Sequence, residues 1–205
     1  MKPGEQADRA DLVLASGNPS VAVWRKDMRN IVNFIYRVVT GSRHVRMIFT
    51  PVFAAFFLIL VLLTIFLALK ADEVFNVSGP VRYPWNYVFS LPLFAIGAFL
   101  WLWSVLHFIK AKGTPVPVSP PPGLVNNGPY AYARNPMLTG VFFILFGIGF
   151  FAGSPSLLFV FAPIFVVCSI LEFKFIEEPE LEKRLGEPYR EYKRRTPMLI
   201  PKLFR

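Results

Sequence analysis

Several residue types that support common soluble functions are scarce in this sequence. There is one cysteine, Cys168, so the chain cannot form an intrachain disulfide. The two histidines, His44 and His107, lie in separate segments without a cysteine or paired acids beside them, so we expect no metal site. The sequence also lacks a glycine-rich phosphate-binding loop and a Ser-His-Asp pattern.

Charged residues are few as well, and this indicates a membrane protein. They make up 17% of the 205 residues, against about a quarter in soluble proteins, whereas 54% of the residues are hydrophobic. The net charge of +9 does not indicate nucleic-acid binding, because the basic residues flank hydrophobic segments and do not alternate with exposed aromatics. Anionic lipid headgroups are the expected partners of these basic residues.

Four apolar segments are expected to cross the membrane as helices. They are residues 47–69, 85–109, 137–151 and 156–176. The last two are joined by a turn of only four residues, 152–155, which predicts an antiparallel helical hairpin. The expected fold is therefore an all-α polytopic membrane bundle of about four transmembrane helices.

Amphipathic helices are predicted at both ends of this bundle. In residues 21–40 the apolar and basic side chains fall on opposite arcs, which fits a helix in the membrane interface or one docked on the bundle. Near the other end, Leu181, Leu185, Tyr189 and Tyr192 form an apolar stripe that predicts a helix folding back over the preceding loop. We expect residues 1–45 to form a cytoplasmic tail and interfacial helix, and residues 46–205 to form the membrane domain.

The distribution of Lys and Arg predicts the orientation. Eight precede residue 47 and nine lie from Lys174 onward, whereas residues 70–84 contain two and residues 152–155 none. Because basic loops stay on the cytoplasmic side, both termini and the loop containing Arg134 are expected in the cytoplasm. The expected location is a bacterial inner membrane.

The most concentrated polar sequence is residues 128–140, which read GPYAYARNPMLTG. Pro129 and Pro136 each fix a backbone φ angle and stiffen this loop. Arg134 precedes an apolar run by a few residues, where an unpaired guanidinium is costly, so we expect it to bind an anionic group. The proline-rich stretch from residue 112 favours a functional loop over an idle linker.

Acidic residues near the end of the fourth apolar segment form a second polar concentration. Glu172 lies within the run, and Glu177 and Glu178 lie at its exit. At about 100° per residue, Glu172 and Glu178 point in different directions. Glu177 or Glu178 can bind a ligand or can pair with Arg134 as a purely structural bridge.

Together these motifs resemble the integral-membrane methyltransferases, over residues 113–201. The matching residues are Gly128-Pro129-Tyr130, Arg134-Asn135-Pro136, Gly140, Glu177-Glu178, Leu181, Gly186, Tyr189, Tyr192, Pro197 and Pro201. That superfamily includes isoprenylcysteine carboxyl methyltransferases and phospholipid N-methyltransferases. The resemblance implies a helical bundle that encloses S-adenosylmethionine on its cytoplasmic side and takes a lipophilic acceptor from the bilayer.

The resemblance also implies roles for individual residues. The cofactor-binding residues are expected to be Gly128, Tyr130, Arg134, Asn135, Glu177, Glu178 and Tyr189, with Arg134, Asn135 and Glu178 acting in catalysis. Arg134 is expected to meet the cofactor carboxylate or to orient an anionic acceptor, and Tyr189 to cover the adenosyl group or to serve in packing. Asn135 replaces the usual histidine and Leu138 the usual tyrosine, so an imidazole base is excluded at this position.

Three acceptors remain open: an isoprenylcysteine-like carboxylate, a phospholipid amine and a small hydrophobic thiol. Two alternative functions also remain, an NADPH-dependent sterol-type membrane reductase and a non-catalytic scaffold that binds anionic lipid. Methyl transfer is favoured over reduction because Glu177-Glu178-x-x-Leu181 follows the Arg-Asn-Pro motif.

Overall fold

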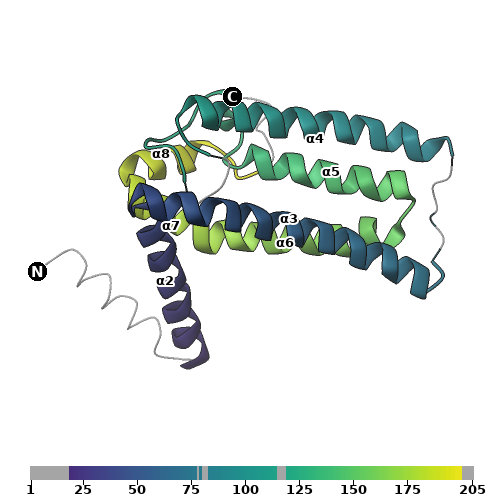
Figure 1. Ribbon diagram of the computed structural model, residues 1–205, viewed down its shortest axis with the longest axis horizontal. Helices are drawn as coiled ribbons and strands as arrows, with labels where there is room; N and C mark the ends of the chain where they lie inside the picture. The colour runs from purple at the N-terminus through teal and green to yellow at the C-terminus, as the bar shows by residue number, and fades with distance from the viewer. Residues whose placement is uncertain (1–18, 78, 80–82, 115–118, 200–205) are drawn as a thin grey trace, which may run out of the picture.

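The computed structural model describes residues 19–77, 79, 83–114 and 119–199 (Figure 1). The expected tail before residue 19 and Pro201 of the family motif lie outside this part. The described residues form helices and no strand, so the predicted all-α bundle is confirmed. The helices are α2 (Pro19–Val39), α3 (Arg43–Val74), α4 (Trp85–Lys110), η1 (Gly128–Ala131), α5 (Pro136–Ala152), η2 (Leu157–Phe161), α6 (Ala162–Glu172), η3 (Phe173–Glu177), α7 (Glu178–Leu185) and α8 (Glu187–Arg195).

All four predicted membrane segments are helical, with different limits. Among the described residues, three helices are long and apolar enough to cross a bilayer, His44–Val74, Trp85–Lys110 and Leu157–Leu185. The third segment, Pro136–Ala152, is an apolar helix of 17 residues. The fourth continues nine residues beyond the predicted end at 176, because α6 passes through the π-helical turn η3 directly into α7.

Glycines allow α4 and α5 to pack closely side by side (Figure 1). A Cβ atom on Gly97 would lie 2.7 Å from the carbonyl oxygen of Gly140, and one on Gly140 would lie 2.8 Å from that of Gly97. Small residues permit such backbone contact between helices in a membrane. This contact fixes the start of α5, where the polar loop ends.

A small apolar core joins α3 to the hairpin of α5 and α6. Ala68, Leu145, Leu157 and Ala162 are fully buried there. Beside this core Asp72 accepts a hydrogen bond from the backbone amide of Ser156 at 3.0 Å and another from the Ser154 hydroxyl. The hairpin turn is thereby held to the end of α3.

Polar caps and glycines set the ends of the elements around the loop. The Asn135 side chain accepts a hydrogen bond from the Leu138 amide at 3.1 Å and so caps α5. Gly186, with φ of +65°, separates α7 from α8. The loop, α7 and α8 lie together at one end of the bundle (Figure 1).

Helix α2 packs against α7. Lys183 donates a hydrogen bond to Asn33 at 2.8 Å, and its ammonium lies 4.3 Å from the Tyr36 ring centroid. The structure thus shows α2 in contact with the rest of the protein, and its position in the membrane interface stays a prediction. Ile31 and Phe34 remain exposed on α2.

Candidate active site

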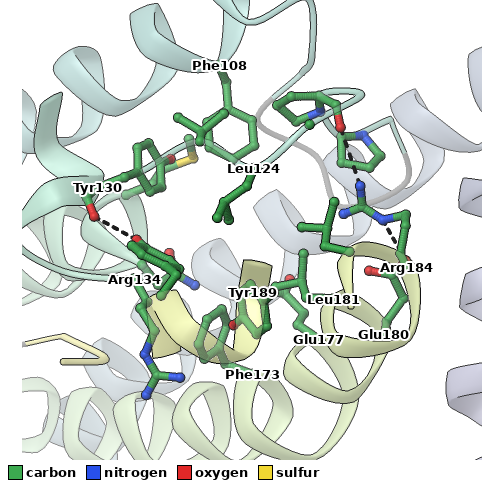
Figure 2. Close-up of a pocket in the computed structure, with 18 of the residues that line it drawn as sticks. Phe108, Leu124, Tyr130, Arg134, Phe173, Glu177, Glu180, Leu181, Arg184 and Tyr189 are labelled. Atoms are coloured by element: carbon green, nitrogen blue, oxygen red, sulfur yellow. Dashed lines mark hydrogen bonds and ion pairs between the residues drawn. The ribbon is translucent and has the colours of Figure 1, made fainter. Parts of the chain in front are cut away.

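A cavity of about 160 Å³ lies where the proline-rich loop, η1, the start of α5, η3, α7 and α8 meet. Figure 2 shows Leu124 near its centre, Phe108 above it, and Phe173 and Tyr189 below. Much of the wall is therefore apolar and aromatic. Tyr130, Glu177, Glu180 and Arg184 add polar groups at its edges.

Five of the seven expected cofactor-binding residues line this cavity, although they come from four separate elements. They are Tyr130, Arg134, Asn135, Glu177 and Tyr189. Gly128 and Glu178 are not among the lining residues. The fold thus brings most of the motif together, and the remaining two residues support it from outside.

Gly128 shapes the loop by its close approach to the end of α4. It has φ of +57°, and a Cβ atom there would lie 2.1 Å from the imidazole nitrogen Nε2 of His107. Any larger residue would push the loop away from α4. Gly128 is therefore needed for the path of the loop beside α4.

Glu178 lies behind the cavity wall in a buried ion-pair network. Its carboxylate forms an ion pair with the Arg134 guanidinium through Oε1 and with the Lys193 ammonium through Oε2, the latter at 2.7 Å. The Glu178 side chain is 2% exposed. Because both of its oxygens are engaged, the structure shows Glu178 as the bridge to Arg134 that the sequence left open as an alternative, and Glu177 as the acid that faces the cavity.

Lys193, on α8, adds a second acid of α7 to this network. Its ammonium also meets Glu182 Oε1 at 2.8 Å. Burial lowers the pKa of Lys193, but its hydrogen bonds to Glu178 and Glu182 outweigh this and raise the pKa above its ordinary value. Lys193 therefore stays charged and helps to hold Glu178 in place.

The carboxyl-terminal segment closes over the loop, as the apolar stripe predicted. The Tyr192 hydroxyl donates a hydrogen bond to the Tyr130 carbonyl oxygen at 2.6 Å. The backbone amides of Arg134 and Asn135 donate to the carbonyl oxygens of Pro197 and Met198 at 2.9 and 3.0 Å. These contacts fix the Arg-Asn-Pro turn against the carboxyl-terminal segment.

Arg184 fixes the other side of the loop. Its guanidinium donates to Glu180 at 2.8 Å and to the Pro121 carbonyl oxygen at 3.3 Å (Figure 2). Sequence reasoning did not single out these two residues. The i, i+4 spacing of Glu180 and Arg184 was the available signal for their pairing, but the contact with Pro121 depends on the path of the loop.

Tyr189 and Arg134 lie close together at the cavity wall. Tyr189 is 2% exposed, and burial together with the Glu178 charge raises the pKa of its hydroxyl. The charge and the hydrogen bonding of the Arg134 side chain oppose these effects, and the hydroxyl stays protonated. The Tyr189 hydroxyl therefore faces the Arg134 side chain at the edge of the cavity.

Glu172 does not line the cavity, and its side chain is exposed on α6. Its carboxylate lies near enough to Glu177 for the two charges to repel each other. Glu172 therefore provides a nearby carboxylate for comparison with Glu177 and Glu178.

A comparison with family models identifies the family to which this helical membrane protein belongs. The phospholipid methyltransferase family matches residues 85–188, just over half of the chain, so the chain belongs to this family. No curated protein and no solved structure gives a significant match. The match confirms the predicted resemblance and covers the loop, Arg134 and both acids.

Proposed function

We propose that the protein is an S-adenosylmethionine-dependent methyltransferase that modifies a lipophilic acceptor at this cavity. The observation that carries the proposal is that motif residues from separate elements, with Arg134 and Asn135 as donors and Glu177 as an acid, line one cavity. S-adenosylmethionine has a zwitterionic amino-acid group attached to a nucleoside, so its site needs hydrogen-bond donors, an acid and an aromatic surface. The cavity also contains the acid, Glu177, and the aromatic residues Phe108 and Phe173.

The polar residues would bind the two charged groups of the cofactor. Arg134 would donate to its carboxylate, and the Glu177 carboxylate would accept hydrogen bonds from its ammonium or ribose hydroxyls. Asn135 uses its Oδ1 atom to cap α5, which leaves its amide group as a donor. Phe108, Leu124 and Phe173 would contact the adenine ring.

Glu178 would act as a positioning residue. The family resemblance implies that Glu178 binds the cofactor and acts in catalysis, but both of its carboxylate oxygens form ion pairs, with Arg134 and with Lys193. We therefore propose that it fixes the Arg134 guanidinium, which in turn contacts the cofactor.

Little acid-base chemistry is required of the side chains. When bound, the sulfonium supplies an already activated methyl group, so the protein chiefly positions the reactants and excludes water. Burial raises the pKa of Tyr130 and Tyr192, so both remain neutral. With Asn135 in place of a histidine, the site fits a role in positioning.

The cavity must widen on binding. Its volume of about 160 Å³ is below the range of about 300–1,000 Å³ typical of small-molecule sites. Leu124 occupies the centre (Figure 2) and belongs to the loop, which is the wall that can move outward most easily. We expect ligand binding to displace Leu124 towards the cytoplasm.

Among the predicted acceptors, the family name favours a phospholipid amine. An isoprenylcysteine-like carboxylate and a small thiol are the remaining acceptors to compare. The predicted orientation, with the site and both termini in the cytoplasm, gives the soluble cofactor access from that side while the acceptor arrives from the bilayer.

Calorimetry on the detergent-purified full chain tests this function. We expect binding of S-adenosylmethionine and S-adenosylhomocysteine and none of NADPH. Binding of NADPH alone would identify a reductase, and binding of none of the three would identify a scaffold. A radiolabelled methyl donor, mixed with extracted lipids and with small thiols, then identifies the acceptor.

A further inference from the structure

A second cavity, of about 470 Å³, lies between the start of α3 and the loop that follows α4. Arg46, Met47 and Pro51 line it from α3, and Lys112, Thr114 and Ser119 line it from the loop. None of these residues lines the first cavity. We call this second cavity the Arg46–Lys112 groove.

The Arg46–Lys112 groove has two cations and no acid in its described lining. Within the described part of the chain, neither Arg46 nor Lys112 forms an ion pair. The Nε atom of Arg46 is buried and has no hydrogen-bond partner there. An uncompensated guanidinium beside an ammonium is the usual arrangement for binding a phosphate.

The backbone holds Lys112 in an uncommon conformation next to Arg46. Its φ is +60°, and its amide donates to the Ile109 carbonyl oxygen at 3.0 Å. Beyond it, the amide and hydroxyl of Thr114 both donate to the Ser119 carbonyl oxygen, at 2.8 and 3.1 Å. These hydrogen bonds hold Thr114 and Ser119 together on the loop side of the groove.

The groove lies at the level where phospholipid phosphates are found. Arg46 is near the start of the span His44–Val74, and Lys112 follows the span Trp85–Lys110 by two residues. Basic residues at the ends of spans meet the headgroup region. Both cations thus mark the same membrane boundary.

The apolar side of the groove continues into the lipid-facing surface of α3. Met47 is 54% exposed, and the next residues along this helix, Ile48 and Val52, are 66% and 56% exposed. A soluble phosphate would use only the cations. A phospholipid would also cover these side chains with its acyl chains.

We propose that the Arg46–Lys112 groove binds the phosphate of a membrane phospholipid whose acyl chains lie along α3. Arg46, Met47 and Pro51 lie outside the segment that matches the family, and the groove is separate from the methyl-transfer cavity. The bound lipid would brace the loop, because Ser119 is followed directly by Pro120 and Pro121 of the first cavity. This site does not depend on whether the protein transfers methyl groups.

The test is a titration of the detergent-purified full chain with phosphatidylglycerol, without any methyl donor. Arg46→Gln and Lys112→Asn should each weaken binding about fivefold, and the double variant about 25-fold, as expected for two cations near a lipid surface. Asparagine is chosen at position 112 because it tolerates positive φ. The matched control is Lys110→Gln, an exposed cation two residues away that does not line the groove and should change binding less than twofold.

Two further ligands distinguish the source of the phosphate. Diacylglycerol with the same acyl chains should not compete with phosphatidylglycerol, and inorganic phosphate should bind at least tenfold more weakly. Competition by diacylglycerol, or equally tight binding of inorganic phosphate, would overturn the proposal. So would an effect of Lys110→Gln as large as that of Arg46→Gln, because it would indicate general surface charge.

The thermal midpoint of each variant shows whether the variant is folded. Arg46→Lys keeps the charge and should retain binding within about twofold of the unmodified chain. If Arg46→Gln lowers the midpoint, Lys112→Asn decides the outcome, because it changes an exposed side chain. Unchanged binding in a folded Lys112→Asn variant would reject the proposal.

Discussion

The buried network around Glu178 gives the sharpest test of the site, through the substitution Glu178→Gln. Glu178 is 2% exposed, and its partners Arg134 and Lys193 are 10% and 36% exposed. Removing one partner of a buried ion pair costs about 3–5 kcal/mol, since the other charge stays buried and uncompensated. In the variant Lys193 keeps its ion pair with Glu182 and is partly screened by water, so we expect the free energy of unfolding to fall by about 3 kcal/mol.

This loss can be measured as a fall in the thermal midpoint in detergent. On the scale of soluble domains of this size, about 3 kcal/mol corresponds to a fall of roughly 6–12 °C. Glu172→Gln is the matched control, because it removes the same charge from an exposed side chain outside the cavity. It should leave the midpoint nearly unchanged.

Cofactor binding separates positioning from direct contact. Glu178→Gln should weaken S-adenosylmethionine binding more than tenfold by releasing Arg134, and Arg134→Ala should abolish it in a protein that can still be extracted folded. Glu177→Gln should weaken binding with little loss of stability. An unchanged midpoint and unchanged binding in Glu178→Gln, or equal effects of Glu178→Gln and Glu172→Gln, would refute this account of the network.

Three further predictions concern the packing and the ionisation of the site. Gly140→Ala should destabilise the protein by about 1–3 kcal/mol, because its Cβ would meet the Gly97 carbonyl oxygen at 2.8 Å; the control Gly123→Ala, with open space around it, should leave the thermal midpoint unchanged. Tyr192→Phe should cost about 1–3 kcal/mol in the same assay, because it leaves the buried Tyr130 carbonyl without its 2.6 Å hydrogen bond. Because burial raises the pKa of Tyr130 and Tyr192 above the ordinary value of about 10, both stay neutral between about pH 7 and pH 10, and the ultraviolet absorbance of tyrosinate in that interval should be the same in the unmodified chain and in the Tyr130→Phe and Tyr192→Phe variants. A tyrosinate signal that either variant loses would show that the hydroxyl ionises.

The membrane helices could be predicted from the sequence because their signal is local. Uninterrupted apolar runs of sufficient length specify helices in a bilayer, and the four predicted segments are all helical. Their ends were less predictable. Helix α3 continues through polar residues to Val74, and Lys70 and Glu73 form an ion pair at 2.7 Å in this extension. The predicted end at residue 69 was set by the end of the apolar run, so these polar residues were left out.

Which of Glu177 and Glu178 faces the cavity could not be predicted from the sequence. Residues Phe173–Glu177 form a π-helical turn, which shifts every later side chain around the axis relative to a regular α-helix. This turn leads directly into α7, with Glu177 at the cavity and Glu178 towards Arg134 and Lys193. Such a turn has no reliable sequence signal.

The loop motif was predictable as a chemical unit, but its three-dimensional path was not. Its prolines, Arg134 and Asn135 stood out because such residues are unusual next to an apolar run. The contacts of Arg184 with Pro121 and of Tyr192 with Tyr130 join segments about 60 residues apart, and no local pattern specifies them.

The backbone pairing of Arg134 and Asn135 with Pro197 and Met198 also bears on how the protein matures. The ribosome makes the loop well before it makes these partners, so the helices can enter the bilayer while the turn still lacks two of its hydrogen bonds. Completion of the pocket therefore has to await the release of residues near 198. A shortened chain that stops before Pro197 would insert normally and yet lack a finished binding surface.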